Sequence, residues 1–74
     1  MKDLAYNIPE GLFNENLDFI FDKIKNTLDG DEIGRWINYA HYLYQNSEES
    51  EGCHKAMSVF EDVVAEYLEL IESL

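Results

Sequence analysis

Apolar residues recur at alternating spacings of three and four along the last third of the chain. The repeat consists of Met57, Phe60, Val64, Tyr67, Ile71 and Leu74, and it is widened by Ala56, Val59, Val63, Leu68 and Leu70. At about 100° per residue, these side chains fill roughly half of a helix circumference. The pattern predicts a helix over residues 54–73 that needs at least two neighbours to cover its apolar face.

Two shorter segments show the same periodicity. The first predicts a helix over residues 13–28, which starts between Leu12 and Leu17 with Asn14 or Asn16 as N-cap and stops before Gly30 as C′ glycine. Its apolar stripe consists of Phe13, Leu17, Ile20, Phe21, Ile24 and Leu28.

The second predicts a helix over residues 32–45, capped by Asp31. Its buried face consists of Ile33, Trp36, Ile37, Ala40, Leu43 and Tyr44. A polar loop follows, and Ser50 or Gly52 provides the cap of the last helix, which begins between Cys53 and Lys55. Two shorter helices and a longer last one, joined by short loops, predict an all-α fold: a small antiparallel three-helix bundle, formed as a single domain over residues 1–74.

Residues 1–11 do not follow the helical period. Leu4, Tyr6 and Ile8 alternate with other residues, and Pro9 disfavours a helical conformation at the preceding residue. The segment Pro9-Glu10-Gly11 suits either a turn or the first turn of a helix. An extended N-terminal arm that lies against the helices is expected, with a strand contributed to a partner as the alternative.

Leu12 and Phe19 lie on the opposite side of the first helix from its apolar stripe. Two explanations are open for these residues. The N-terminal arm folds back and covers Phe19, or the two side chains form an apolar interface with a partner.

Charge is the strongest feature of the composition. Sixteen acidic residues against five basic ones give a formal net charge of −11. This charge repels nucleic acid and anionic membranes and speeds encounter with a basic surface, although it also serves solubility alone. The single cysteine, the absence of a signal peptide and the absence of a long apolar run predict a soluble cytoplasmic protein without membrane contact.

The sequence holds little that points to catalysis or to a cofactor. No zinc, EF-hand or phosphate-loop motif is present, and Asp29-Gly30-Asp31-Glu32 is better explained as a helix stop followed by a helix start than as a metal site. Cys53, near the start of a helix, together with His41 or His54 is the one candidate for nucleophilic catalysis. We expect no metal, no cofactor and no enzymatic activity.

The candidate site residues are therefore on the surface. The acidic candidates are Glu48, Glu49 and Glu51 in the second connection and Glu61, Asp62, Glu66, Glu69 and Glu72 along the last helix. No lysine or arginine follows Lys55, whereas ordinary solvated helix faces mix the two signs. Tyr39 and Tyr42 are expected to point outward, and tyrosine is a residue type that anchors protein interfaces.

These features favour a non-enzymatic acidic protein that binds and masks a basic surface on a nuclease or another nucleic-acid-binding protein. Bacteriocin immunity proteins and phage inhibitors of host defence are of the same type, small and acidic, although no motif here identifies either family. A nucleic-acid mimic would act in the same way. The alternative hypothesis is a structural module in which the broad apolar face of the last helix forms a homodimer or joins a larger complex.

Overall fold

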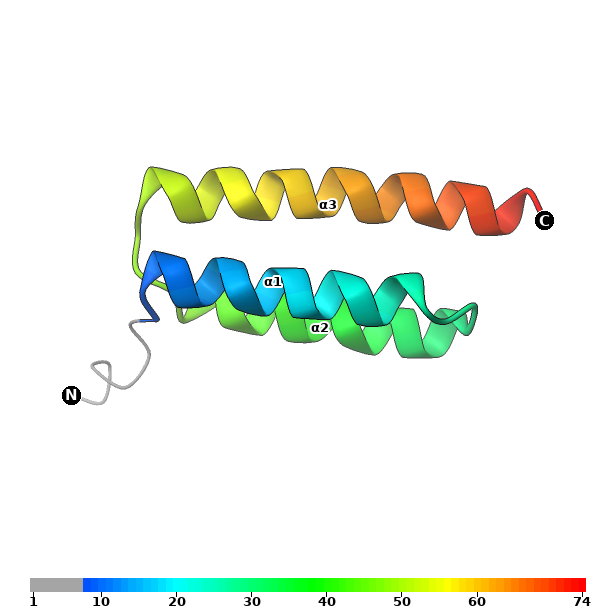
Figure 1. Ribbon diagram of the computed structural model, residues 1–74, viewed down its shortest axis with the longest axis horizontal. Helices are drawn as coiled ribbons and strands as arrows, with labels where there is room; N and C mark the ends of the chain where they lie inside the picture. The colour runs from blue at the N-terminus through cyan, green and yellow to red at the C-terminus, as the bar shows by residue number, and fades with distance from the viewer. Residues whose placement is uncertain (1–7) are drawn as a thin grey trace.

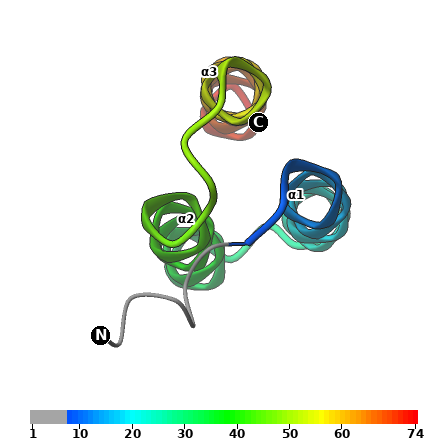
Figure 2. The ribbon, with the colours of Figure 1, turned by 90° about the vertical axis from the view of Figure 1, so that its left-hand side faces the viewer.

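Three antiparallel helices form the fold in the computed structural model, which describes residues 8–74. They are α1 (Glu10–Lys25), α2 (Gly30–Gln45) and α3 (Glu51–Glu72). Figure 1 shows α1 and α2 side by side with α3 along them, and Figure 2 shows the helices at the corners of a triangle. The predicted all-α antiparallel three-helix bundle is confirmed.

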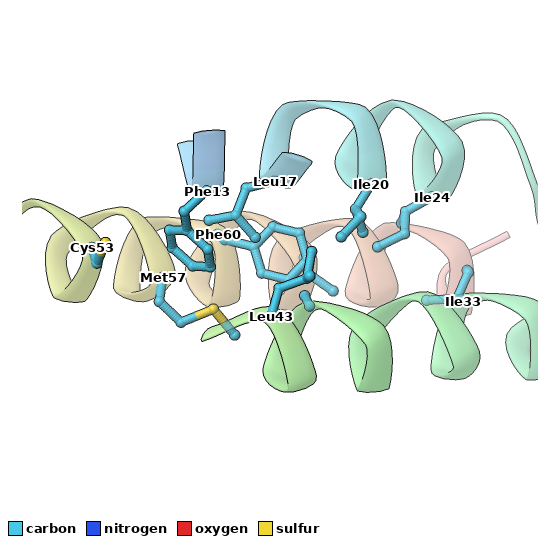
Figure 3. Packing of buried hydrophobic residues seen from close by; sticks show 11 residues of the cluster. Phe13, Leu17, Ile20, Ile24, Ile33, Leu43, Cys53, Met57 and Phe60 are labelled. Atoms are coloured by element: carbon cyan, nitrogen blue, oxygen red, sulfur yellow. The ribbon is translucent and has the colours of Figure 1, made fainter. Parts of the chain in front are cut away.

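The core lies on the axis of this triangle, and all three helices contribute buried side chains to it. Figure 3 shows side chains from all three helices converging there. The buried residues are Phe13, Leu17, Ile20 and Ile24 of α1, Ile33, Ala40 and Leu43 of α2, and Cys53, Met57, Phe60 and Val64 of α3. α1 packs closely against both other helices, whereas α2 and α3 approach each other less closely. Each large apolar side chain removed from water here contributes about 1.5–3 kcal/mol.

α1 begins at Glu10, earlier than the sequence pattern predicted, and neither Asn14 nor Asn16 caps it. Pro9 is the N-cap, in an extended conformation and without a side-chain cap bond. The amide of Glu10 instead donates a part-buried hydrogen bond of 2.7 Å to Oε2 of Glu48, which lies far along the chain. A carboxylate at a helix N-terminus also interacts favourably with the helix dipole.

The turn between α1 and α2 also differs from the prediction. α1 ends at Lys25 with Asn26 as C-cap, so Leu28 lies in the turn and is exposed. Asp29, not Asp31, caps α2, because its side chain accepts a hydrogen bond of 3.0 Å from the amide of Asp31. Gly30 is the first residue of α2 rather than a C′ glycine, and its φ is not positive.

The start of α3 follows the prediction more closely. Ser50 is the N-cap, and its Oγ accepts a hydrogen bond of 3.1 Å from the amide of Cys53. α3 begins at Glu51, slightly before the expected start. Its 22 residues exceed the 16 of α1, so its C-terminal end extends about 9 Å further at 1.5 Å per residue (Figure 1).

The end of the N-terminal arm pairs with the loop before α3. The amide of Ile8 donates to the carbonyl of Asn46, and the amide of Glu48 donates to the carbonyl of Ile8, both at 2.8 Å. These bonds form an isolated parallel bridge between Ile8 and Ser47, and Ile8 packs against the core. One of the two explanations for Phe19 was that Leu4, Tyr6 or Ile8 of the arm covers it, and Leu4 and Tyr6 lie outside the described residues.

A hydroxyl group joins the opposite end of α1 to α3. Tyr67 donates its O–H to the carbonyl oxygens of Lys25 at 3.1 Å and Thr27 at 3.0 Å. These carbonyls lie at the C-terminal end of α1, where backbone acceptors have no partner within the helix. The side chain of Tyr67 therefore closes the end of the α1–α3 interface.

We predict that Tyr67→Phe lowers the free energy of unfolding by about 1 kcal/mol, since it removes this hydrogen bond and little apolar area. Urea denaturation followed by circular dichroism measures the change. Tyr39→Phe is the matched control, because the Tyr39 hydroxyl has no hydrogen bond within residues 8–74. Equal losses in the two variants would contradict the assigned role of Tyr67.

Candidate interaction surfaces

The acidic side chains of α3 form a continuous exposed surface, which we call the α3 stripe. It consists of Glu61, Asp62, Glu66, Glu69 and Glu72, all of which are exposed. Among residues 8–74, no lysine or arginine forms an ion pair with any of them. Glu61 faces α2, where its Oε2 lies 3.5 Å from Nε2 of His41. The other four point away from the bundle, so their charge is available to a partner.

The acids of the second connection have different environments. Glu48 is half-buried and holds the N-terminus of α1 through the amide of Glu10. Its predicted place in a partner-binding surface therefore competes with a role in the fold. Glu49 and Glu51 are exposed at the same end of the bundle. They are separated from most of the α3 stripe by several turns of α3.

Four aromatic rings form a row along the outer side of the α1–α2 interface. Phe19 packs edge-on against Trp36 at 5.9 Å between ring centroids, and Trp36 packs edge-on against Tyr39 at 6.2 Å. Tyr39 stacks on Tyr42 at 6.4 Å. The Nζ of Lys23 lies 5.2 Å from the centroid of the Phe19 ring. Trp36 of α2 therefore covers one side of the Phe19 ring, and Phe19 remains half-exposed.

The helical period placed Trp36 on the buried face of its helix, and Trp36 does pack against the core while its ring also joins this row. Trp36, Tyr39 and Tyr42 follow one another at spacings of three, which is the available signal. The partner ring Phe19 comes from another helix and could not be assigned from periodicity. Leu12, two turns before Phe19 on the same side of α1, is also half-exposed.

The aromatic row and the α3 stripe lie on different sides of the molecule. His41 faces α3, as its contact with Glu61 shows. Tyr39 precedes His41 by two positions and is therefore rotated about 200° from it around α2. Figure 2 shows that the outer side of the α1–α2 pair points away from α3. Tyr39 and Tyr42 cannot contact the same small surface of a partner as the α3 stripe.

A groove runs between α1 and α3 and has a volume of about 470 Å³. Its walls are mostly apolar, with charged side chains near its edges. The lining residues are Glu10, Asn14, Leu17, Asp18 and Phe21 of α1, and Gly52, Lys55, Ala56, Val59, Phe60 and Val63 of α3. The Oδ1 atom of Asn14 is buried there and has no hydrogen-bond partner among the described residues. We call this feature the α1–α3 groove.

A smaller polar recess lies at the end of the bundle where α2 meets α3. The hydroxyl of Tyr44 and Nδ1 of His54 form a hydrogen bond across it. Its lining also includes Ser47, whose Oγ donates to the carbonyl of Tyr44 at 2.8 Å. The serine hydroxyl is therefore directed at the backbone and away from the imidazole, which is not the arrangement of a nucleophile and its base.

Cys53 was the candidate nucleophile, and the structure places its side chain in the core at 1% exposure. A thiol buried among apolar side chains cannot reach a substrate at the surface.

Residues 8–74 also contain no cluster of three or more histidine, cysteine, aspartate or glutamate side chains that could hold a metal ion. No helix within this part of the chain is long and apolar enough to cross a bilayer.

Comparison of the chain with protein-family models, with curated proteins and with solved structures finds no match.

We predict that Cys53 reacts with a thiol reagent at least about 100-fold more slowly in the native protein than in the urea-unfolded chain. The reaction requires opening of the core, and a small domain resists opening by roughly 3–5 kcal/mol. Labelling with iodoacetamide followed by mass spectrometry measures both rates. Native labelling within a few-fold of the unfolded rate would contradict burial of the thiol and restore Cys53 as a candidate nucleophile.

Proposed function

We propose that this protein binds a basic surface on a protein partner through the α3 stripe and blocks that surface. The observation that carries the proposal is the absence, within residues 8–74, of lysine or arginine partners for five exposed acids on one helix. Nearby positive charge would reduce the attraction to a basic partner. Within the described part of the chain, no lysine or arginine offsets the negative charge of α3, and the formal net charge of the whole sequence is −11.

The spacing of the stripe supports a nucleic-acid-binding protein as the partner. From Glu61 to Glu72 the helix rises about 17 Å, which corresponds to roughly one negative charge per 4 Å. Phosphates along one strand of DNA are about 3.4 Å apart along the helix axis. A basic groove built for a phosphate backbone therefore meets a similar line of charge on α3. Binding of this kind inhibits by occlusion and needs no chemistry from the inhibitor.

The electrostatic field of the whole chain would act before contact. A net charge of this size steers a cationic partner toward the protein, and salt screens the effect over a Debye length of about 8 Å at physiological ionic strength. The aromatic row, on the other side of α1 and α2, is not required for this step.

A pair of variants with the same net charge tests the proposal. Glu69→Gln with Glu72→Gln neutralises two acids of the stripe, while Glu15→Gln with Asp31→Asn neutralises two exposed acids elsewhere. We predict that the stripe variant binds the native partner about tenfold more weakly, because each exposed ion pair contributes up to about 1 kcal/mol. The control variant is expected to bind as the parent does.

Capture of the partner from native cell extract at low salt, followed by titration calorimetry with the purified partner, provides the measurement. The bound protein should elute as salt is raised and should lose its nucleic-acid binding in the complex. Equal weakening by the two variants would show that only bulk charge matters. A captured protein that elutes with no dependence on salt would refute the proposal.

Self-association is the second candidate function, and one observation favours it. α3 extends beyond α1 and α2, and Leu70 and Leu74 are 62% and 88% exposed in this region. A second copy could cover them. Two chains that each carry a charge of −11 repel each other, however, and the acids of the stripe occupy the same end of α3.

We therefore expect a monomer of 8.7 kDa in sedimentation equilibrium at low ionic strength. A dimer that dissociates when Leu70 is replaced by asparagine would instead establish the second candidate. Raising the salt concentration serves as the control, since screening favours association of like-charged chains.

A further inference from the structure

The α1–α3 groove is an apolar surface that the three helices leave uncovered. Val59 lies in its wall and is 55% exposed, while Phe21 on the facing helix is half-buried. Exposed apolar side chains that line a concave surface are typical of a binding site, whereas single ones on a convex surface are not. The groove is therefore the place where an apolar partner group would gain most from burial.

The groove follows the direction of the helices. Leu17 and Phe21 are separated by four residues on α1, and Val59 and Val63 by four residues on α3. Side chains at this spacing lie on one side of a helix, so the two pairs form facing rows. Leu70 continues the α3 row after another two turns and is exposed. Two parallel rows of this kind accept an amphipathic helix, which would complete a four-helix arrangement.

The charges beside the groove select among amphipathic helices. Asp18 lies in the α1 wall, and Asp22 follows it one turn later on the same side. On α3, Glu66 follows Val63 by three positions and lies on the outer flank of the row.

Two lysines are near the groove but do not reverse its charge. Lys55 lines one end beside Glu10, and the Nζ of Lys25 is 5.2 Å from the centroid of the Phe21 ring. The α3 stripe runs along the neighbouring side of the same helix. A helix with lysine and arginine on its flanks therefore fits, and a second copy of this acidic chain does not.

The cost to the free protein supports the same conclusion. The buried Oδ1 of Asn14 in the groove wall has no partner within the described residues, and a buried acceptor without a partner lowers the stability of the free protein. The Val59 side chain is 55% exposed, so more than half of it stays in water in the free bundle. These features do not improve folding of the isolated chain, whereas an apolar groove is useful to a binding protein.

We propose that the α1–α3 groove binds a basic amphipathic helix of the partner protein. The apolar face of that helix would pack between Phe21 and Val59, and its basic flanks would contact Asp18 and Glu66. This inference rests on the proposed function, because it assigns the partner of the α3 stripe a definite secondary structure and an apolar contact.

A synthetic peptide tests the groove without knowledge of the partner. The probe has about five turns of helix built from leucine and lysine, with leucine on one face only, and a scrambled peptide of identical composition has no apolar face. We predict that titration calorimetry gives at least about tenfold tighter binding for the amphipathic peptide. Burying one valine-sized contact contributes about 1.5 kcal/mol, which corresponds to this factor.

Two matched variants locate the contact. Val59→Asn places an amide in the groove wall, and Leu12→Asn makes the same kind of change at a residue that is 50% exposed on another side of α1. Val59→Asn is expected to abolish the preference for the amphipathic peptide, while Leu12→Asn leaves it unchanged. Val59→Leu should retain binding. Amide chemical shifts of the labelled protein should change around residues 14–21 and 55–63, and they also show that each variant is folded.

The outcomes separate this inference from the proposed function. Four results would overturn the groove as a helix site. They are equal affinity for the two peptides, unaltered binding by Val59→Asn, shift changes confined to the aromatic row, and no binding of either peptide. In all four cases the stripe variants still decide whether a basic partner is bound. If the stripe variant and Val59→Asn both lose binding of the native partner, the two proposals are supported together.

Discussion

The structure depends on the packing of one apolar stripe of α1 against both other helices. Phe13, Leu17, Ile20 and Ile24 are buried, and α1 makes close contact with α2 on one side and with α3 on the other. α2 and α3 contact each other mainly through side chains, such as Tyr44 with His54 and His41 with Glu61. Because α1 fixes the length of the core, the longer α3 must extend beyond it. The exposed leucines at the end of α3 follow from that difference in length.

The acids of the α3 stripe, which form no ion pair with lysine or arginine among residues 8–74, destabilise the helix that carries them. Asp62 and Glu66 are four positions apart, while Glu66, Glu69 and Glu72 are each separated by three, so these acids are neighbours on the helix surface. Like charges at such spacings destabilise a helix by about 0.2–0.5 kcal/mol per pair. The core offsets this repulsion in the free protein. A cationic partner would remove it, so part of the repulsion stored in free α3 becomes a contribution to binding.

Helical periodicity predicted the buried positions well because burial in a bundle depends on local spacing. Phe13, Ile20 and Phe60 are buried as their spacing indicated. Helix boundaries were harder to predict, since they depend on hydrogen bonds that compete locally or come from distant residues. Asp29 and Asp31 both have the chemistry of an N-cap, and only the folded turn selects Asp29.

The start of α1 was left open by its own sequence, because Pro9-Glu10-Gly11 suits either a turn or the first turn of a helix. Its first amide is satisfied by Glu48, and no local pattern links Glu10 to a residue in a later loop. The aromatic row and the groove share this property, because each is formed by two helices whose separation the sequence does not specify. The α3 stripe lies on one helix, and it was therefore visible from spacing alone.

The positions of the three surfaces limit how they can be used. The α1–α3 groove and the α3 stripe share one helix, so a single partner that places a helix in the groove also reaches the nearest acids of the stripe. The aromatic row of Phe19, Trp36, Tyr39 and Tyr42 lies beyond α1 and α2 and would remain uncovered in such a complex. Half-exposed rings that a first partner cannot cover are available to a second. The arrangement thus suits either a simple inhibitor that uses one side of the bundle or an adaptor that uses both. Binding on the α3 side is weakened chiefly by salt, whereas binding on the aromatic row is weakened chiefly by substitution of its rings, so the two effects identify the side in use.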